Sequence, residues 1–234
     1  VEEAGGREVA FGVAEGLPEE YVSSMIQDDQ GFMWFSTQNG LVKFDGYKMK
    51  VIRGTEKKGD STKLQQRNFN GGSIKSKDGR IWFGGFPPGG IASYDPETEK
   101  FRNYLPNPND PKTMPFQGSI LLFEDSKNNI WFGNTSFDLD TTVIGRLDTE
   151  THSIKSNPYP ITNGKYNDIV LNFEILEANG DKSIWIKDEV GNVRVLNREK
   201  DVFELVIQSG SEIPGSVMLD TIQNITRGYK DHFL

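Results

Sequence analysis

The sequence contains no cysteine and only two histidines, His152 and His232. The absence of cysteine excludes a disulfide framework, thiolate catalysis and cysteine-ligated metal sites. Both histidines fall in predicted turns, so the sequence supports neither a histidine-based metal site nor a catalytic triad. We therefore expect no catalytic residue, no metal and no cofactor in this segment.

Long apolar runs and basic clusters are missing as well. No stretch approaches the roughly 18 apolar residues that a membrane-spanning helix needs, so we expect no membrane contact by this segment. The net charge is −8 and no cationic stripe is present to neutralise phosphates, which argues against nucleic-acid binding. Residues 1–12 are acidic and glycine-rich, a composition that does not suit a signal peptide.

The residues that are abundant favour strands and tight turns. The chain of 234 residues has 25 glycines and 11 prolines, and aromatic residues make up 11% of it. No segment keeps a 3.6-residue apolar period over three turns, which argues against helical repeats. The tryptophans recur in equivalent surroundings at intervals of about 50 residues, a spacing typical of a β-propeller. They are Trp34, Trp82, Trp131 and Trp185.

Each repeat reads as four short strands joined by turns. The first shows apolar alternation over 21–27, a turn at 28–31, a strand over 32–37 and the hairpin pair Asn39-Gly40. We therefore predict an all-β fold, a β-propeller fragment with four blades of four antiparallel strands and the start of a fifth. The expected blades are 17–53, 68–104, 116–156 and 167–207, with an incomplete fifth at 215–234.

The repeated residues have a structural and a functional interpretation. One bulky side chain per repeat fills the wedge between neighbouring sheets, which favours a core role for the tryptophans over stacking on sugar rings. Paired carboxylates can be catalytic, but a periodic placement at turns favours caps for turn amides. The recurring carboxylates are Asp28, Asp45, Asp95, Asp125 and Asp148. A separate pair, Asp138 and Asp140, offers too few oxygens for a calcium site.

The unrepeated loops before the first strand of each blade are the candidates for recognition. Loops at the mouth of a propeller channel carry binding in many propellers. Here they hold Glu19 and Glu20, Gln66, and a set of amides, an arginine and tyrosines that could bind a sugar or a uronic acid. Ordinary solvated loop composition explains the same residues. The candidate ligand-binding residues are Tyr21, Arg67, Asn68, Asn70, Gln117, Tyr166 and Asn167.

The repeat pattern consists of an aliphatic strand, Asp, two residues, Gly, an apolar residue, Trp, then Gly-Leu and an aromatic-Asp pair. The first copy, GLPEEYVSSMIQDDQGFMWFSTQNGLVKFDGYKMKVI, matches throughout, and KDGRIWFGG with SYDPETEKFRNY forms a good second copy. Later copies depart from the pattern, with Asn128 in place of the turn glycine and Glu177 in place of the turn Asp. Over residues 9–234 the chain resembles the two-component regulator propeller family, in particular the periplasmic sensors of hybrid two-component systems of Bacteroidetes.

The resemblance implies an extracytoplasmic, periplasmic domain of a membrane protein. Such sensors carry seven-bladed propellers followed by a transmembrane helix and a histidine kinase. The chain is then expected to recognise an oligosaccharide, to contact the remaining propeller blades and a homodimer partner, and to signal to the kinase without being an enzyme itself. Two alternatives remain open: a protein-interaction or dimerisation platform without its own ligand, and a secreted propeller polysaccharide lyase or glycosidase.

Overall fold

The computed structural model describes residues 11–54, 62–107, 109–110, 112–136, 141–160, 173–178, 181–187, 193–197, 200 and 202–207. The chain divides into two compact units. The first comprises Val1–Glu124, Asn128–Asn134 and Gly145–Lys155, and the second comprises the other residues.

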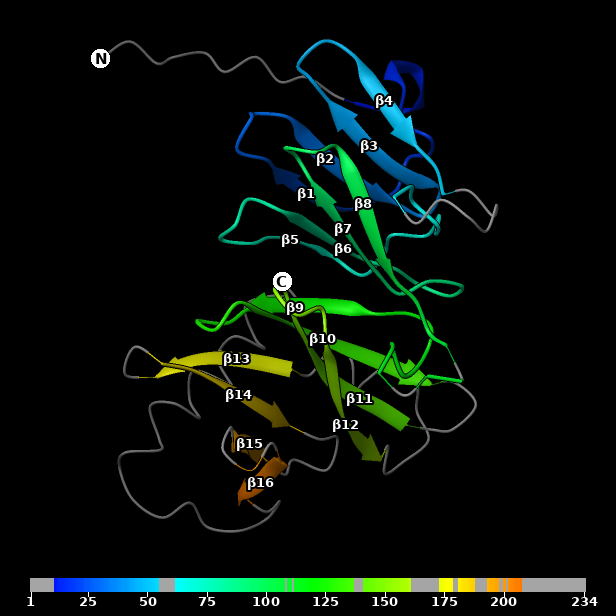
Figure 1. Cartoon of the computed structure of the whole chain (residues 1–234). Helices are drawn as coiled ribbons and strands as arrows, with labels where there is room; N and C mark the ends of the chain where they lie inside the picture. The colour runs from blue at the N-terminus through cyan, green and yellow to red at the C-terminus, as the bar shows by residue number, and fades with distance from the viewer. Residues whose placement is uncertain are drawn as a thin grey trace, which may run out of the picture. The chain divides into compact units, whose positions relative to one another are not determined.

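The described part of the chain folds into antiparallel sheets of four strands, after a single 3-10 turn, η1 (Val13–Glu15) (Figure 1). The first sheet contains β1 (Val22–Gln27), β2 (Met33–Thr37), β3 (Gly40–Phe44) and β4 (Met49–Ile52). The second contains β5 (Ser73–Lys75), β6 (Ile81–Gly84), β7 (Ile91–Asp95) and β8 (Lys100–Tyr104). The third contains β9 (Ile120–Glu124), β10 (Asn129–Ser136), β11 (Thr141–Asp148) and β12 (Ile154–Pro160).

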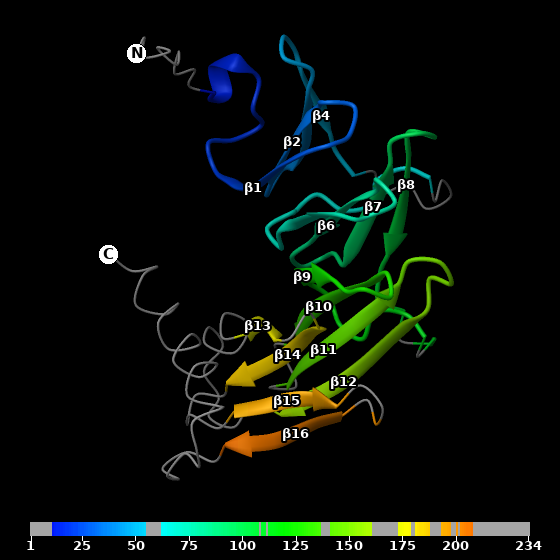
Figure 2. The same ribbon diagram turned by 90° about the vertical axis from the view of Figure 1, so that its left-hand side faces the viewer.

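The fourth sheet belongs to the second unit, and Figure 2 shows its strands side by side. It contains β13 (Phe173–Ala178), β14 (Asp181–Lys187), β15 (Val193–Asn197) and β16 (Val202–Ile207). Every sheet has its strands in chain order, so each is a meander joined by hairpins. The predicted all-β fold with four blades of four antiparallel strands is therefore confirmed. The predicted fifth blade at 215–234 lies outside the described residues.

A single carboxylate joins the first turn of the first sheet to its tryptophan. Asp28 is buried, and its Oδ1 accepts the backbone N–H groups of Gln30 at 3.0 Å and Phe32 at 2.9 Å. Its Oδ2 accepts the indole N–H of Trp34 at 2.9 Å. Because a buried indole N–H needs an acceptor, this arrangement fixes both the turn and the ring that follows it.

The second sheet divides the same task between two residues. The Ser76 hydroxyl oxygen accepts the indole N–H of Trp82 at 2.9 Å, and its one proton faces two acceptors, Asp78 Oδ1 at 2.5 Å and the backbone oxygen of Arg80 at 3.0 Å. The carboxylate of Asp78 accepts the Arg80 backbone N–H at 3.1 Å. In the third sheet, Asp125 accepts the backbone N–H of Lys127 at 2.8 Å.

Carboxylates also close the turns between the third and fourth strands of each sheet in the first unit. Asp45 accepts two backbone N–H groups, from Tyr47 at 2.8 Å and Lys48 at 2.6 Å. These bonds favour the ionised form, so the Lys48 and Tyr47 amides lower the pKa of Asp45. The equivalent residues, each of which also accepts two turn amides, are Asp95 and Asp148.

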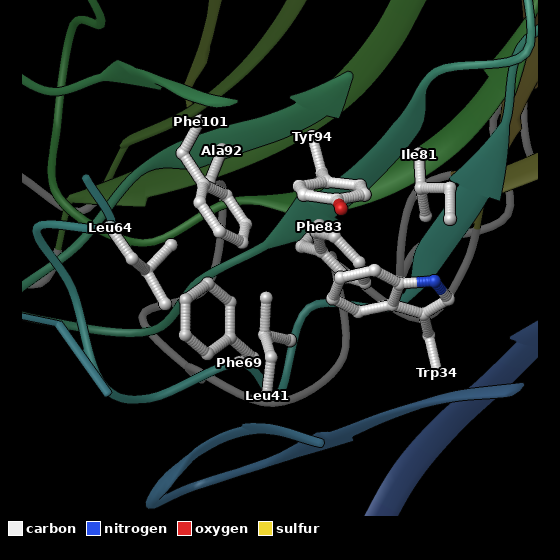
Figure 3. Close-up of a cluster of buried hydrophobic side chains, with 9 residues drawn as sticks. All are labelled: Trp34, Leu41, Leu64, Phe69, Ile81, Phe83, Ala92, Tyr94 and Phe101. Carbon is white, nitrogen blue, oxygen red and sulfur yellow. The ribbon is translucent and has the colours of Figure 1, made fainter. Parts of the chain in front are cut away.

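Aromatic packing between successive sheets forms the core of the first unit. Figure 3 shows Trp34 and Leu41 of the first sheet pointing toward side chains of the second, among them Phe83 and Tyr94. The Trp34 ring centroid lies 4.5 Å from that of Tyr94. The next interface repeats the pattern with Trp82, whose ring stacks on Tyr104 at 5.7 Å. The indoles of Trp34 and Trp82 are fully buried, so no ring face remains open for stacking on a ligand.

The remaining tryptophans occupy the second strands of their sheets. Trp131 in β10 is 2% exposed, and its ring stacks on Phe123 with a centroid separation of 6.2 Å. Trp185 lies in β14 opposite Glu174 and Val195. All four therefore keep the same strand position in successive sheets.

The first strands of the first three sheets lie within the first unit and are neighbours, since β5 contacts both β1 and β9. A backbone hydrogen bond joins β9 to the segment just before β5: the amide of Leu121 donates to the oxygen of Gly71 at 2.8 Å. A Cβ added at Gly71 would lie 1.9 Å from the backbone oxygen of Ser119, so only glycine fits there. The sheets thus converge on their first strands, as the blades of a propeller do.

Candidate functional site

The chain segments that precede β1, β5 and β9 meet at one end of the first unit. The amide of Phe86, in the β6–β7 loop, donates to the backbone oxygen of Asn68 at 3.1 Å. The amide of Gly118 donates to the oxygen of Gly89, in the same loop, at 2.8 Å. The β6–β7 loop therefore connects the approach to β5 with the approach to β9. We call this surface the loop end and define it by residues 17–21, 66–72, 85–90 and 116–119.

Most of the predicted binding residues lie at the loop end. The Tyr21 side chain is 55% exposed and stands just ahead of Ser23, whose hydroxyl donates to the backbone oxygen of Phe69 at 2.7 Å. The predicted residues that the structure brings together here are Tyr21, Arg67, Asn68, Asn70 and Gln117. Arg67 and Gln117 are exposed, whereas Asn68 and Asn70 are half-buried. Tyr166 and Asn167 lie outside the described residues.

Gln66 lies in the same segment and organises the loop end from within. Its side chain is 2% exposed, and its Oε1 accepts the backbone N–H of Gly90 at 2.6 Å. A Cβ added at Gly85 would lie 2.7 Å from the Gln66 amide, so the glycine-rich loop wraps closely around it. Gln66 Nε2 and Asn68 Oδ1 are buried and have no hydrogen-bond partner in the part of the chain that the structure describes. They are a donor and an acceptor buried below the surface of the loop end.

A second polar region lies between the second and third sheets. It is at the end away from the loop end, near the β7–β8 and β11–β12 turns. Strand alternation puts Ser93 and Arg102 on the same face of the second sheet as Trp82, because the three residues are cross-strand partners. The tryptophan end of this face packs against the third sheet, and the remainder borders a cavity of about 560 Å³. We call it the second crevice; its polar lining includes Arg80, Ser93, Asp95, Arg102, Tyr104 and His152.

His152 and Tyr104 hold each other at the inner wall of the second crevice. The Tyr104 hydroxyl lies 2.9 Å from His152 Nδ1, and the Tyr104 side chain is 8% exposed. Burial raises the pKa of Tyr104, although the positive charge of Arg102 opposes the shift. Burial, followed by the charges of Arg102 and Arg80, lowers the pKa of His152. Near neutral pH the pair is therefore a neutral phenol and a neutral imidazole beside cationic side chains.

The first crevice, between the first and second sheets, uses the equivalent positions differently. Lys43 replaces Ser93, and its ammonium lies 3.9 Å from the ring centroid of Phe32 and 5.4 Å from those of Trp34 and Tyr94. The cavity here has about 660 Å³ and is lined in part by apolar side chains, including Leu64 and Phe101. Its charged side chains are mainly lysines. A lysine ammonium acts as a point charge and lacks the paired, directional donors of an arginine guanidinium.

The described residues that line the two crevices include no set of metal ligands. No cluster of three His, Asp or Glu side chains in the described ranges could hold a metal ion. Asp138 and Asp140 lie outside those ranges. The crevices were not predicted from the sequence, because Arg80, Arg102 and His152 are far apart along the chain. Strand alternation in the second repeat was the only sequence pattern that could have indicated the second crevice. It places polar residues on a face that also carries buried aromatics, at positions 80, 82, 91, 93, 102 and 104.

One family matches the sequence directly. Residues 16–39, from the approach to β1 through the β2–β3 turn, match the family described as Two component regulator propeller. The chain carries a two component regulator propeller repeat. The matched segment contains the Asp28–Trp34 unit and ends at the hairpin turn, so the predicted family resemblance is confirmed. No curated protein sequence matches the chain.

Solved structures extend the likeness over most of the chain. The extracellular domain of BT3049 from B. thetaiotaomicron, described as a hybrid two component system, is 22% identical with a TM-score of 0.63, over 86% of this chain and 26% of that one. The corresponding domain of BT4673 is 19% identical with a TM-score of 0.50, over 79% and 24%. Virginiamycin B lyase from Staphylococcus aureus is 15% identical with a TM-score of 0.50, over 83% and 59%.

At identities of 22% or less, these three likenesses show similarity of fold alone. The chain spans about a quarter of the length of the two B. thetaiotaomicron domains. Within the described residues, no helix is long and apolar enough to cross a membrane.

Proposed function

We propose that this chain is part of the extracytoplasmic sensor region of a hybrid two-component signalling protein and binds an oligosaccharide at the loop end. The observation that carries the proposal is the convergence of five predicted residues on one surface of the first unit, where residues 16–39 match the two component regulator propeller family. They are Tyr21, Arg67, Asn68, Asn70 and Gln117. The amide atoms of Gln66 and Asn68 that have no partner among the described residues add a donor and an acceptor below that surface. Exposed aromatic, guanidinium and amide groups together suit a polyhydroxylated ligand.

Signalling requires only that the ligand bind two arrangements of the receptor with different affinity. The loop end suits this role because the approaches to three sheets are hydrogen-bonded to one another there. A ligand that contacts these segments would bias how the sheets and the other blades pack. We propose that the response passes to a histidine kinase in the same protein, with a homodimer as the signalling form. In this proposal the segment lies in the periplasm and catalyses no reaction.

The decisive experiment measures binding of an oligosaccharide panel to the complete protein by thermal shift and calorimetry. A glycan that binds should lose about tenfold in affinity in Arg67→Ala, since a charge-assisted hydrogen bond contributes about 1.5–3 kcal/mol. The matched control is Lys75→Ala, whose exposed ammonium pairs with Asp29 at 2.7 Å at the other end of β5. Equal losses in both variants would contradict a site at the loop end.

Two further outcomes separate the alternatives. If no glycan stabilises the protein, the chain is a protein-interaction or dimerisation platform. If a glycan is cleaved during the titration, the protein is an enzyme. The likeness to virginiamycin B lyase motivates this alternative, because one fold can host both binding and catalysis.

A further inference from the structure

The second crevice combines fixed hydroxyl groups with arginine side chains. Ser93 is 4% exposed and Tyr104 is 8% exposed, so their hydroxyl groups are held by the surrounding core. Arg102 is the cross-strand partner of Ser93, one strand farther out, and is exposed at the rim. The hydroxyls thus lie at the base of the cavity and a guanidinium lies at its mouth.

The charges at this site favour an anion. Asp95 is committed to its own turn, where it accepts the N–H groups of Glu97 at 2.9 Å and Thr98 at 3.3 Å. Arg80 pairs with Asp78 at 3.2 Å. Arg102 forms no ion pair with a carboxylate in the described part of the chain, and its charge is felt by both Tyr104 and His152. Arg102 is therefore a cation available to an external acid, and Lys100 also borders the cavity.

The cavity volume and its uncharged polar side chains restrict the class of ligand further. A guanidinium binds a planar carboxylate through two parallel hydrogen bonds. Thr62 and Gln65 border the cavity on the side of the segment that covers the edge of β8. Together with Ser93 and Tyr104, these side chains can donate to and accept from several hydroxyl groups. A cavity of about 560 Å³ has room for one or two sugar rings.

We propose that the second crevice is a binding site for a sugar carboxylate, a uronic acid, whose carboxylate pairs with Arg102 and whose hydroxyls contact Ser93, Tyr104 and Gln65. His152 positions Tyr104 through their hydrogen bond. The site is separate from the loop end and does not depend on the function proposed there. Its ligand reaches it either as a free sugar acid or as the terminal residue of an acidic oligosaccharide.

The test is calorimetric titration of the complete protein with galacturonate and glucuronate, alongside glucose, acetate and sulfate. A uronate should bind at least about tenfold more tightly than glucose, because only the acid can pair with the guanidinium. It should also bind more tightly than acetate, which lacks the hydroxyls. A di-uronide that binds more tightly than the free acid would identify the oligosaccharide end as the natural ligand, and the reverse order would identify the free acid.

Variants locate the site. Arg102→Gln should reduce uronate affinity about tenfold, whereas Lys50→Gln should leave it unchanged. Lys50 is the matched control because it occupies the equivalent position in β4, opposite Lys43. Equal losses in both variants would show that diffuse positive charge, not the second crevice, attracts the ligand. Tighter binding of sulfate than of uronate, equal binding of glucose, or no binding of either uronate would each overturn the proposal.

Discussion

The two crevices of the first unit occupy equivalent positions and differ in what fills them. In the first, the cross-strand row is Trp34, Lys43 and Lys50; in the second, it is Trp82, Ser93 and Arg102. Lys43 turns its ammonium toward aromatic rings of its own fold, a contact that satisfies the charge within the protein. Ser93 is too short to do so, and the corresponding space faces Arg102, Tyr104 and His152.

This difference shows that a repeat can keep its core residue while the residues beside it vary. The tryptophan position is constant, because every interface needs a bulky apolar side chain between sheets. The two positions beside it in the row differ between the sheets: Lys43 and Lys50 in the first, Ser93 and Arg102 in the second. Variation there changes the chemistry of a crevice without changing the blade.

The largest effect is expected from truncating the tryptophans themselves. Both Trp34→Ala and Trp82→Ala should lower the free energy of unfolding by about 4 kcal/mol, because each removes a fully buried indole from a sheet interface. Trp34→Ala should cost more, since it also removes the indole donor from the buried carboxylate of Asp28. Urea unfolding followed by circular dichroism measures both values.

Tyr47→Ala is the control for these variants, because its side chain is 94% exposed in a turn of the first sheet. It should change the unfolding free energy by less than about 0.5 kcal/mol. If either tryptophan variant is as stable as this control, the indoles do not support the interfaces, and the equivalence of the two crevices fails.

A smaller effect should come from the acceptors of the two indoles. Asp28→Ala removes an acceptor from two turn amides and from Trp34, so we expect a loss of about 3 kcal/mol. Ser76→Ala should cost about half as much, because Asp78 still holds the Arg80 amide. The same urea titration measures both. Asp29→Ala provides a neighbouring carboxylate for comparison. Asp29 is exposed and, among the described residues, is paired only with Lys75, so the change should cost at most about 0.5 kcal/mol.

The order of the two losses tests how the turns are built. If Ser76→Ala costs as much as Asp28→Ala, the second sheet depends on its hydroxyl alone, and the division of labour with Asp78 is wrong.

The period and the strand pattern were sufficient to predict the fold, because spacing and alternation are properties of the chain itself. The loop end was predicted in outline for a related reason: the first strands of all blades start on the same side, so Tyr21, Arg67 and Gln117 had to lie near one another. The hydrogen bond from Gln66 to the β6–β7 loop was not predicted, because it depends on how that glycine-rich loop packs around the Gln66 amide.

Other features depend on packing that no local pattern reveals. Ser76 replaces the repeated turn Asp in the second sheet, and the sequence gives no sign that its hydroxyl accepts the Trp82 indole while Asp78 holds the turn. The second crevice needs the β11–β12 turn to bring His152 to Tyr104, residues that are 48 positions apart. Such contacts are set by how neighbouring sheets pack.

The smallest effect, and the one that most directly separates the crevices, is a pH dependence confined to the second. The pKa of His152 lies below its ordinary value of 6.5, first because of burial, then because of Arg102 and Arg80, with Asp148 opposing. The unfolded chain therefore takes up a proton at a higher pH than the folded chain. This part of the stability is complete above pH 6.5 and is lost as the pH falls toward the lower, folded-state pKa.

His152→Gln should remove this dependence, so the variant should lose less stability than the parent chain between about pH 7 and about pH 5. Urea titrations at several pH values measure the difference, and the comparison cancels any contribution of His232. Other charged groups bordering the neighbouring hollow beside His152 are Lys77, Asp78, Glu124 and Glu150. Lys43→Gln, in the first crevice, should leave the pH profile unchanged, because no histidine is among the described residues that line that crevice. Identical profiles for His152→Gln and the parent chain would mean that burial and the neighbouring arginines do not lower the pKa of His152, and this difference between the two crevices would then be wrong.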